Sequence, residues 1–261
     1  MLHPGLYERV INNALTGELA EIPEVRKSVA PIDKAEASKV LAQYLADVVQ
    51  KGLDNVLDNG GDISAQIGLT NQIVDLIQNT TKEADFAALG VDRRAEQLLA
   101  LLRETDPRLA VGKTAADIER PETSIAQSSL FTGAVHEPQM FTELKKEIVS
   151  ADRIDMLVSF IKWSGLRLIM DELREFTQNG GELRIITTSY MGATDVKAIE
   201  ELRKLPNTHI KVSYNTKTTR LHAKAYIFYR ETGFTTAYVG SSNLSNAALT
   251  SGLEWNTKVT R

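Results

Sequence analysis

The spacing of apolar positions divides the chain into two parts. Up to about residue 103, apolar side chains recur at helical spacing. Examples are Val40, Leu41, Tyr44, Leu45 and Val48, then Ile73, Val74 and Ile77, then Leu98, Leu99, Leu101 and Leu102. The pattern breaks at Pro23, Pro31, the turn at residues 59–62 and Gly90. We therefore predict a small helical bundle, forming an all-helical N-terminal domain over residues 1–104.

Beyond residue 129 the pattern alternates between amphipathic runs and short apolar runs. We expect helices over residues 137–150, 164–178 and 194–205, and strands over residues 154–161, 183–188 and 209–214. A hairpin follows, and the chain ends on a further strand. Residues 105–129 contain Pro, Thr and Ser with little periodicity, so we interpret them as a linker. The predicted fold class is α/β, with a mixed sheet flanked by helices over residues 130–261.

Composition narrows the class of protein. The chain has 261 residues, 43% of them hydrophobic and 25% charged, which is typical of a soluble globular protein with room for two domains. It has no cysteine, and its four histidines lack metal-ligand spacing, so we expect neither disulfides nor a metal centre. No segment resembles a secretion signal or a membrane span. We therefore expect a cytoplasmic protein without a membrane partner.

Charge is distributed unevenly along the chain. The formal net charge is −4, from 30 basic and 34 acidic side chains. Residues 1–110 carry a net charge of −6 and residues 130–261 a net charge of +3, and no acidic residue occurs between Leu202 and Arg230. That stretch contains Arg203, Lys204, Lys211, Lys217, Arg220, Lys224 and Arg230. It either follows a nucleic-acid backbone or forms a solvated strand and loop, and the motif beside it favours backbone contact.

One pair of motifs carries candidate chemistry. His222 and Lys224 stand two residues apart at the start of an apolar run, so on a strand their side chains point to the same face. A hairpin length later the chain reads Gly240-Ser241-Ser242-Asn243. Antiparallel pairing about residues 230–234 sets Lys224 opposite Gly240 and His222 opposite Ser242. Imidazole, ammonium, hydroxyl and amide groups therefore meet at one end of the predicted hairpin.

This set of groups suits a phosphodiester. A lysine supplies positive charge to phosphoryl oxygens, and small residues let backbone N–H groups approach an anion where residues 243–250 are expected to begin a helix. A histidine attacks phosphorus or transfers protons near neutral pH. The alternative is a buried strand that begins with an incidental histidine, followed by an ordinary Gly-Ser turn. The second motif at hairpin distance favours the phosphate site.

The two motifs resemble the signature of the phospholipase D superfamily, His-x-Lys followed by Gly-Ser-x-Asn. The matching residues are His222, Lys224, Gly240, Ser241 and Asn243. Tyr229 replaces the aspartate that is usual soon after the lysine. In compact bacterial nucleases of that superfamily, a glutamate eleven residues beyond the asparagine orients the histidine, and Glu254 stands at that spacing. The alternative for Glu254 is a surface acid on a strand.

The resemblance implies a phospholipase D-like sheet over residues 130–261 and a role for each site residue. His222 is the nucleophile or its acid/base partner, and Glu254 orients the imidazole. The expected phosphate ligands are Lys224, Ser241, Ser242, Asn243, Arg220 and Lys217. The reaction uses two histidines and the chain has one complete motif, so we expect two chains to share the site as a homodimer. No cofactor is expected for this segment.

A second resemblance covers residues 121–261 and, less distinctly, the whole chain. Residues 158–165, 187–194 and 252–256 resemble the N-terminal region of bacterial DEAD/DEAH-type helicases that carry a phospholipase D-like module. This implies a metal-independent DNA nuclease with a phosphohistidine intermediate, linked to a helicase motor beyond residue 261 that uses ATP and magnesium. The alternative is a catalytically degenerate module that binds DNA or phosphates and targets the helicase.

Overall fold

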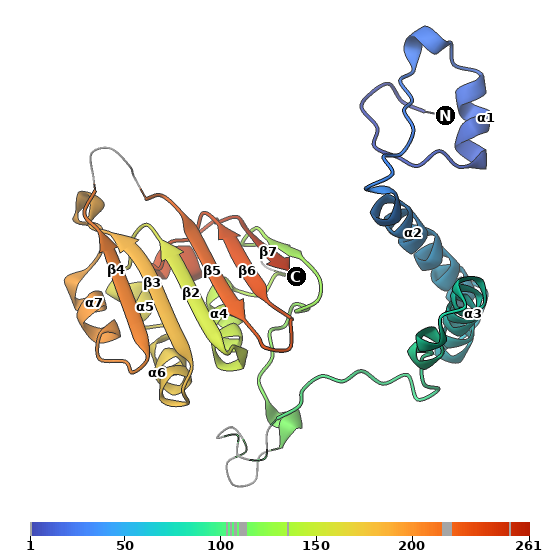
Figure 1. The fold of residues 1–261 in the computed structure, drawn as a ribbon. Coiled ribbons are helices and arrows are strands. Elements are labelled where there is room, and N and C mark those ends of the chain that lie inside the picture. Colours follow the sequence, from blue (N-terminus) through green and yellow to red (C-terminus); the bar gives the residue numbers. More distant parts are fainter. Residues whose placement is uncertain are drawn as a thin grey trace. The chain divides into compact units, whose positions relative to one another are not determined.

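A computed structural model describes residues 2–102, 104, 106, 109, 114–134, 136–215, 221–250 and 252–261. The chain divides into two compact units, Met1–Leu99 and Ala100–Arg261. The first contains helices and no strand among its described residues, and the second contains a sheet flanked by helices (Figure 1). The predicted fold class, an α/β region preceded by an all-helical one, is confirmed.

The regular structure of the first unit consists mainly of α-helices, named α1 (Asn13–Ala20), α2 (Ala37–Asp58) and α3 (Ile63–Thr81). Two short 3-10 helices, Glu24–Arg26 and Ala84–Leu89, accompany them. Helix α3 begins at Asp62, whose carboxylate accepts a hydrogen bond of 3.0 Å from the backbone N–H of Ala65. The turn before it needs a glycine, because Gly60 has a φ of 83°. Helices α2 and α3 therefore form a helical hairpin.

The leucine-rich segment at residues 98–102 is not helical, so that part of the sequence prediction is wrong. The Asp92 carboxylate accepts a hydrogen bond of 2.9 Å from the backbone N–H of Arg94, and Ala95 has a φ of 56°. A left-handed residue cannot continue a right-handed helix. The leucines therefore follow a turn in irregular chain, and Leu98 and Leu101 are each 83% exposed.

The first unit lacks a closed hydrophobic core. Among its described residues the only buried hydrophobic side chain is that of Leu15, and neither α2 nor α3 contains a buried residue. One stripe of α2, formed by Leu41, Leu45 and Val48, is between 44% and 55% exposed. The predicted bundle is therefore a hairpin of helices with an open apolar face.

The second unit is built on a seven-stranded mixed sheet with the order β1-β7-β6-β5-β2-β3-β4. The strands are β1 (Ser129–Phe131), β2 (Arg153–Val158), β3 (Glu182–Thr188), β4 (Thr208–Ser213), β5 (Lys224–Tyr229), β6 (Thr236–Gly240) and β7 (Asn256–Thr260). Strands β2, β3 and β4 are parallel, and all other pairs are antiparallel. The carboxyl ends of the parallel strands therefore lie at the same edge as the start of β5 and the end of β6.

Helices cover one face of this sheet (Figure 1). They are α4 (Met140–Ser150), α5 (Trp163–Leu166), α6 (Met170–Gln178), α7 (Val196–Leu202) and α8 (Asn246–Thr250), with a 3-10 helix at Tyr190–Gly192. The single helix predicted over residues 164–178 is divided into α5 and α6. The chain leaves helical geometry at Ile169, which has a ψ of 10° and a fully buried side chain. Burial of that side chain is favoured over continuation of the helix.

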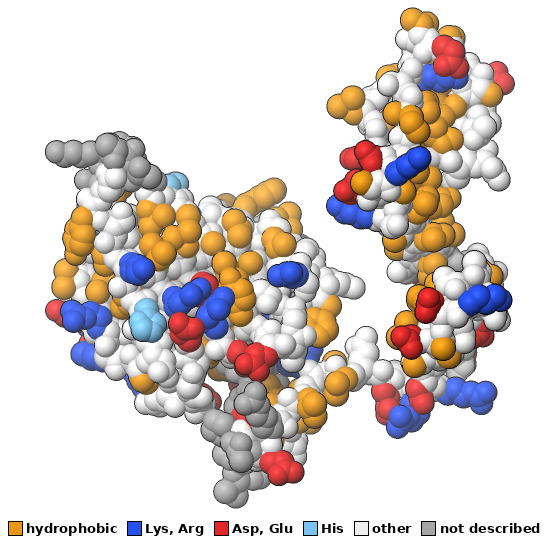
Figure 2. Space-filling model, viewed as in Figure 1, with side chains coloured by type: hydrophobic (Ala, Val, Ile, Leu, Met, Phe, Trp, Pro, Cys, Tyr) orange, Lys and Arg blue, Asp and Glu red, His pale blue; other side chains and the backbone are white. Residues whose placement is uncertain are grey.

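The two faces of the sheet differ in burial. The covered face holds the core, including Leu144 and Ile148 of α4, Leu173 of α6, and Tyr226 and Phe228 of β5. The opposite face, which we call the open face, exposes Leu130, Ile186, Val239 and Val259, each between 43% and 51%. Figure 2 shows hydrophobic side chains gathered over the strands of this face, with a mixed basic and acidic cluster among them. The open face therefore combines exposed apolar side chains with a cluster of charged ones, and the described helices of the chain do not cover it.

Part of the predicted linker is attached to the second unit. Glu143 of α4 is fully buried, and its carboxylate accepts hydrogen bonds from the backbone N–H groups of Glu122 and Thr123, at 2.6 and 3.3 Å. Strand β1 then begins at Ser129 and pairs with β7. Residues 122–131 are therefore held against the sheet and α4.

Candidate active site

His222 and Lys224 lie together at the start of β5. The Nζ atom of Lys224 lies 3.2 Å from Nδ1 and 3.1 Å from Nε2 of His222, and it donates to the His222 carbonyl at 3.2 Å. The lysine is 8% exposed, whereas His222 is exposed. Burial lowers the pKa of the Lys224 ammonium, and the negative charge of Glu254 opposes that change. The pair is thus an accessible imidazole beside a largely desolvated cation.

The strand register brings the second motif next to this pair. Strands β5 and β6 pair Ala225 with Val239, and the same register sets Lys224 opposite Gly240, as the sequence predicts. Gly240 in turn pairs with Asn256 of β7. A side chain at position 240 would not fit, because its Cβ would lie 2.1 Å from the Trp255 carbonyl oxygen. The glycine therefore allows β7 to approach the end of β6 closely.

Asn243 lies beside the carboxyl end of β2. Its side-chain oxygen accepts a hydrogen bond of 3.3 Å from the backbone N–H of Phe160. One residue earlier, the Ser159 hydroxyl donates to the Ala223 carbonyl at 3.2 Å, between His222 and Lys224. The loop after β2 therefore links the Asn243 amide to the start of β5. The sequence did not identify Ser159 or Phe160 as site residues, because their contacts here involve backbone atoms, which no sequence motif specifies.

The two neighbouring serines have different environments. Ser241 is exposed, and its hydroxyl accepts from the backbone N–H of Trp255 at 3.0 Å. Ser242 is fully buried, and its hydroxyl accepts from the Asn256 amide at 2.8 Å and donates to the Ala248 carbonyl at 3.4 Å. A substrate oxygen cannot reach a side chain that is enclosed in this way. The geometry therefore makes Ser242 a support of the loop rather than the phosphate ligand expected from the sequence.

Glu254 and His222 lie two residues before the starts of β7 and β5. Continued past the strand ends, the registers set Glu254 opposite Ser242 and Ser242 opposite His222. Adjacent strands are about 4.8 Å apart, so two strand spacings separate the glutamate from the histidine. Among the described residues no hydrogen bond joins these two side chains. The effect of Glu254 on the pKa of Lys224 shows that its charge acts on this end of the hairpin.

The basic stretch near the site is only partly available to a nucleic acid. Lys217 and Arg220, two expected phosphate ligands, lie outside the described residues. Arg230 is 8% exposed, and its Nη2 lies 2.6 Å from the Glu147 carboxylate, so backbone contact by Arg230 is a wrong prediction. Lys204 and Lys211 are exposed. The described part of the chain contains no cluster of three or more potential metal ligands, and it has no helix long and apolar enough to cross a membrane.

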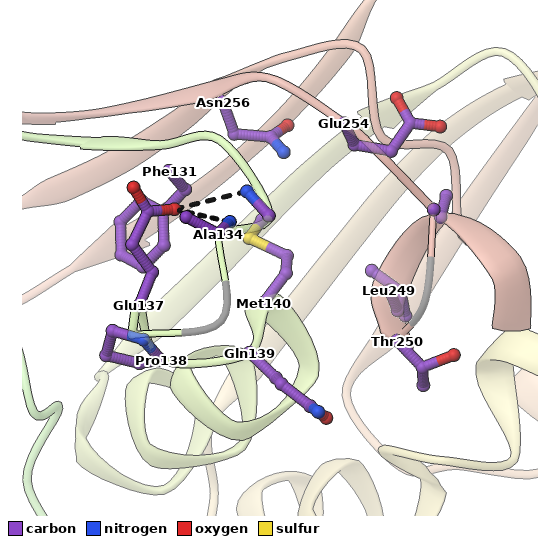
Figure 3. Close-up of a pocket in the computed structure, with 13 residues that line it drawn as sticks. Phe131, Ala134, Glu137, Pro138, Gln139, Met140, Leu249, Thr250, Glu254 and Asn256 are labelled. Carbon is purple, nitrogen blue, oxygen red and sulfur yellow. Dashed lines mark hydrogen bonds between the residues drawn. The ribbon is translucent and has the colours of Figure 1, made fainter.

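A cavity of about 240 Å³ lies between the start of α4 and helix α8 (Figure 3). Phe131, Met140 and Leu249 contribute apolar surface, and Gln139, Thr250, Glu254 and Asn256 contribute polar groups. Glu254 and Asn256 therefore belong both to the cavity and to the surroundings of the two motifs. The sequence contains no signal for this cavity, because its walls come from three separate segments.

Comparisons with solved structures found several proteins to which part of this chain is similar. NucT from Helicobacter pylori is 22% identical over 51% of this chain and 84% of that chain, with a TM-score of 0.39. Nuc from Salmonella typhimurium, a phospholipase D family member, is 23% identical over 52% and 84%, with a TM-score of 0.39. Yeast tyrosyl-DNA phosphodiesterase is 14% identical over 51% and 31%, with a TM-score of 0.32. The comparison with curated proteins found no match.

The family comparison covers the same part of the chain as the two motifs. Residues 144–261 match the family described as "Cardiolipin synthase, PLD-like domain". The match includes β2 to β7, and with them His222, Lys224, Asn243 and Glu254. Residues 144–261 of this protein are therefore similar to phospholipase D-like domains.

Proposed function

We propose that the second unit is a metal-independent phosphodiesterase that cleaves DNA through a phosphohistidine intermediate. The observation that carries the proposal is the contact of Lys224 Nζ with the imidazole of His222, at 3.1 and 3.2 Å, at an edge where β5, β6 and the loop after β2 meet. Among the described residues no carboxylate is in ion-pair contact with the buried ammonium of Lys224. The ammonium therefore favours an anion, and the exposed imidazole lies within reach of the same anion.

The groups support a two-step reaction. An imidazole nitrogen of His222 attacks phosphorus, the bond from phosphorus to the leaving oxygen breaks, and a second imidazole donates a proton to that oxygen. Water then attacks the phosphohistidine and gives its proton to the second imidazole, which restores both histidines. Lys224 and the NH2 group of Asn243 stabilise the charge on the phosphoryl oxygens. Glu254 orients the imidazole of His222.

The second imidazole is the partner's His222 in a homodimer. One chain has only one copy of the motif, and closed twofold symmetry gives a shared site two copies.

Cleavage of DNA in the presence of a chelator tests the activity. We expect the full chain to cut single- or double-stranded DNA in excess EDTA and to form an acid-labile covalent adduct in which the imidazole is joined through phosphorus to one DNA strand. His222→Ala should abolish both, whereas His209→Ala, which alters another exposed histidine, should leave them unchanged. Cleavage retained by His222→Ala would reject the assignment.

Mixing tests the shared site. Addition of inactive His222→Ala chain to wild-type chain should lower cleavage as mixed dimers form, because each mixed site has one imidazole. If activity depended only on the amount of wild-type chain, each chain would hold a complete site.

The alternative is a degenerate module that binds DNA without cutting it, suggested by Tyr229 in place of the usual aspartate. Tyr229 lies at the far end of β5 from His222, and its ring packs 3.8 Å under the Arg153 guanidinium. The replacement therefore affects the open face rather than the site, which favours the active enzyme. Salt-sensitive DNA binding without turnover or phosphohistidine would support the alternative.

We also propose, from the sequence resemblance alone, that this module serves an ATP-dependent DNA helicase in the cytoplasm and needs no cofactor itself. Nuclease activity in the full-length product should then continue without ATP, while any unwinding requires ATP and magnesium. A full-length product without an ATP-binding loop would reject the link to a helicase.

A further inference from the structure

The cavity at the start of α4 has no role in the proposed cleavage chemistry. Phe131, Met140 and Leu249 form its apolar lining, which we call the apolar floor. Gln139, Thr250, Glu254 and Asn256 contribute its polar groups. Pockets that enclose drug-sized ligands measure roughly 300–1,000 Å³. At about 240 Å³, this cavity suits a single ring system better than a complete nucleotide.

The walls of the cavity are formed before any ligand binds. The Glu137 carboxylate accepts hydrogen bonds from the backbone N–H groups of Thr132 and Gly133, at 2.6 and 3.1 Å, and of Ala134 (Figure 3). These bonds, first of all the one from Thr132, hold the pKa of Glu137 below its usual value. The acid is thus engaged with the turn that forms one wall. On the other side, the Asn256 amide is bonded to Ser242.

The cavity lies beside the proposed site. Glu254 lines the cavity, and the negative charge of the same carboxylate acts on the ammonium of Lys224. Asn256, which also lines the cavity, donates a hydrogen bond to Ser242 of the second motif. A ligand that occupies the cavity while a phosphodiester lies at His222 must therefore carry a ring system close to its phosphate. Nucleic acids have this property at every residue.

We infer that the cavity receives one nucleobase of the nucleic-acid strand, next to the phosphodiester that His222 attacks. The inference rests on the proposed function and adds a subsite to it. The apolar floor contacts the faces of the base, and Gln139 and Thr250 reach its polar edge. An acyl chain fits less well, because it would place apolar groups against the polar side chains that line the cavity.

The test combines a substitution that fills the cavity with substrates that lack one base. Ala248 of α8 lines the cavity and is 8% exposed, whereas its neighbour Ala247 is exposed and does not line it. The substrates are an oligodeoxynucleotide of fixed sequence and versions with an abasic residue at each position near the cut. Loss of one base contact should raise KM roughly 10- to 100-fold.

We expect wild-type enzyme to show this rise for one abasic position beside the cut. Ala248→Leu should show it already with the complete oligonucleotide, and the abasic residue should then add nothing. Ala247→Leu should behave as wild type. Gln139→Ala, at the exposed rim, should change the preferred base at that position without a change in melting temperature.

The outcomes separate the two proposals. If wild-type enzyme cuts none of the oligonucleotides, the proposed function fails. If it cuts them but the effects of Ala248→Leu and of the abasic residue multiply, or no abasic position matters, the cavity does not receive a base. Should Ala248→Leu fail to fold, an unchanged base preference in Gln139→Ala would overturn the inference.

Discussion

Lys224 and Lys258 are two buried lysines on the covered face of one sheet, and they differ in their partners. Lys258 of β7 is fully buried, with Nζ 2.9 Å from the Glu147 carboxylate and 3.2 Å from the Thr123 carbonyl. Lys224 of β5 is 8% exposed, and its Nζ atom contacts the ring and the carbonyl of His222, both uncharged acceptors when the imidazole is neutral. Among the described residues, Lys258 has a carboxylate in ion-pair contact and Lys224 has none.

The surroundings of Lys258 form a satisfied network of charges. Glu147 also binds Arg230 at 2.6 Å, and it accepts hydrogen bonds from the hydroxyls of Thr236 at 2.7 Å and Tyr238 at 3.0 Å. Because every one of these groups has an internal partner, the network has no need of a ligand. We call the following residues the buried charge network: Glu143, Glu147, Arg230, Thr236, Tyr238 and Lys258.

The comparison separates structural charge from functional charge. A buried cation costs free energy unless an opposite charge lies beside it. In the buried charge network that opposite charge is protein, whereas at Lys224 it is expected from a substrate phosphate. Substitutions in the network should therefore lower stability, whereas substitution of Lys224 should lower activity.

The largest expected effect on stability comes from Glu147→Leu. The change leaves the guanidinium of Arg230 and the ammonium of Lys258 buried without their shared carboxylate, which should cost about 3–5 kcal/mol of unfolding free energy. Urea unfolding followed by circular dichroism measures the loss. Glu175→Leu, in the exposed face of α6, is the matched control and should change stability by less than about 0.5 kcal/mol. An equally small loss in Glu147→Leu would show that the network is not structural.

Lys224→Met should lower activity and not stability, in contrast to Glu147→Leu. Loss of the ammonium removes charge stabilisation of the phosphoryl oxygens, so kcat for DNA should fall about 10²- to 10³-fold. Unfolding free energy should stay constant or increase, since burial already disfavours the charged lysine. Lys39→Met, which loses an exposed pair with Glu36 in the first unit, is the control for kcat. A drop in stability without a drop in kcat would make Lys224 a structural lysine like Lys258.

The hairpin could be predicted from sequence because its information is local. The spacing of His222, Lys224 and Gly240 contains both the strand period and the turn, and β5 and β6 pair in the expected register. The buried charge network could not be predicted in this way. Its members Glu147, Arg230 and Lys258 are far apart in the chain. In addition, sequence patterns assign a lysine on a half-buried strand to the exposed face. Only the packing of α4 on the sheet shows that Arg230 is unavailable to DNA.

The proximity of the candidate site residues was predictable as far as the motif extends. His222 and Lys224 are in contact, whereas Ser241 and Ser242 have identical chemistry in the sequence and opposite exposure in the fold. Burial at this end of the sheet depends on Asn256 and Ala248, which contact Ser242 from β7 and α8. In the first unit, helix periodicity alone predicted a packed bundle. Periodicity identifies an apolar stripe but does not show whether another helix packs against it.

The neighbouring serines offer a smaller and sharper comparison. Ser242→Ala leaves the buried amide of Asn256 without one partner, so it should lower unfolding free energy by roughly 1–3 kcal/mol and leave kcat of the folded enzyme unchanged. Ser241→Ala should lower kcat about tenfold if its hydroxyl binds phosphate, with little effect on stability. Kinetics and urea unfolding of both variants measure the difference. A reversal of the two results would make Ser242 the phosphate ligand.

The smallest effect concerns pH and tests the network without removing a side chain. Burial alone would raise the pKa of the Glu147 carboxyl, but the charges of Arg230 and Lys258 outweigh burial and hold the pKa below 4.5. A carboxyl whose pKa is lower in the folded than in the unfolded state contributes stability above pH 4.5, and this contribution is lost as the pH falls through the folded value. Unfolding free energy should therefore decrease below pH 4.5, and the decrease should be smaller in Glu147→Gln, which cannot titrate. Urea titrations at several pH values between 7 and 3 compare the two proteins. Equal decreases in both would mean that other carboxyls account for the acid sensitivity, and the ion pairs of Glu147 would then have no measurable share in stability.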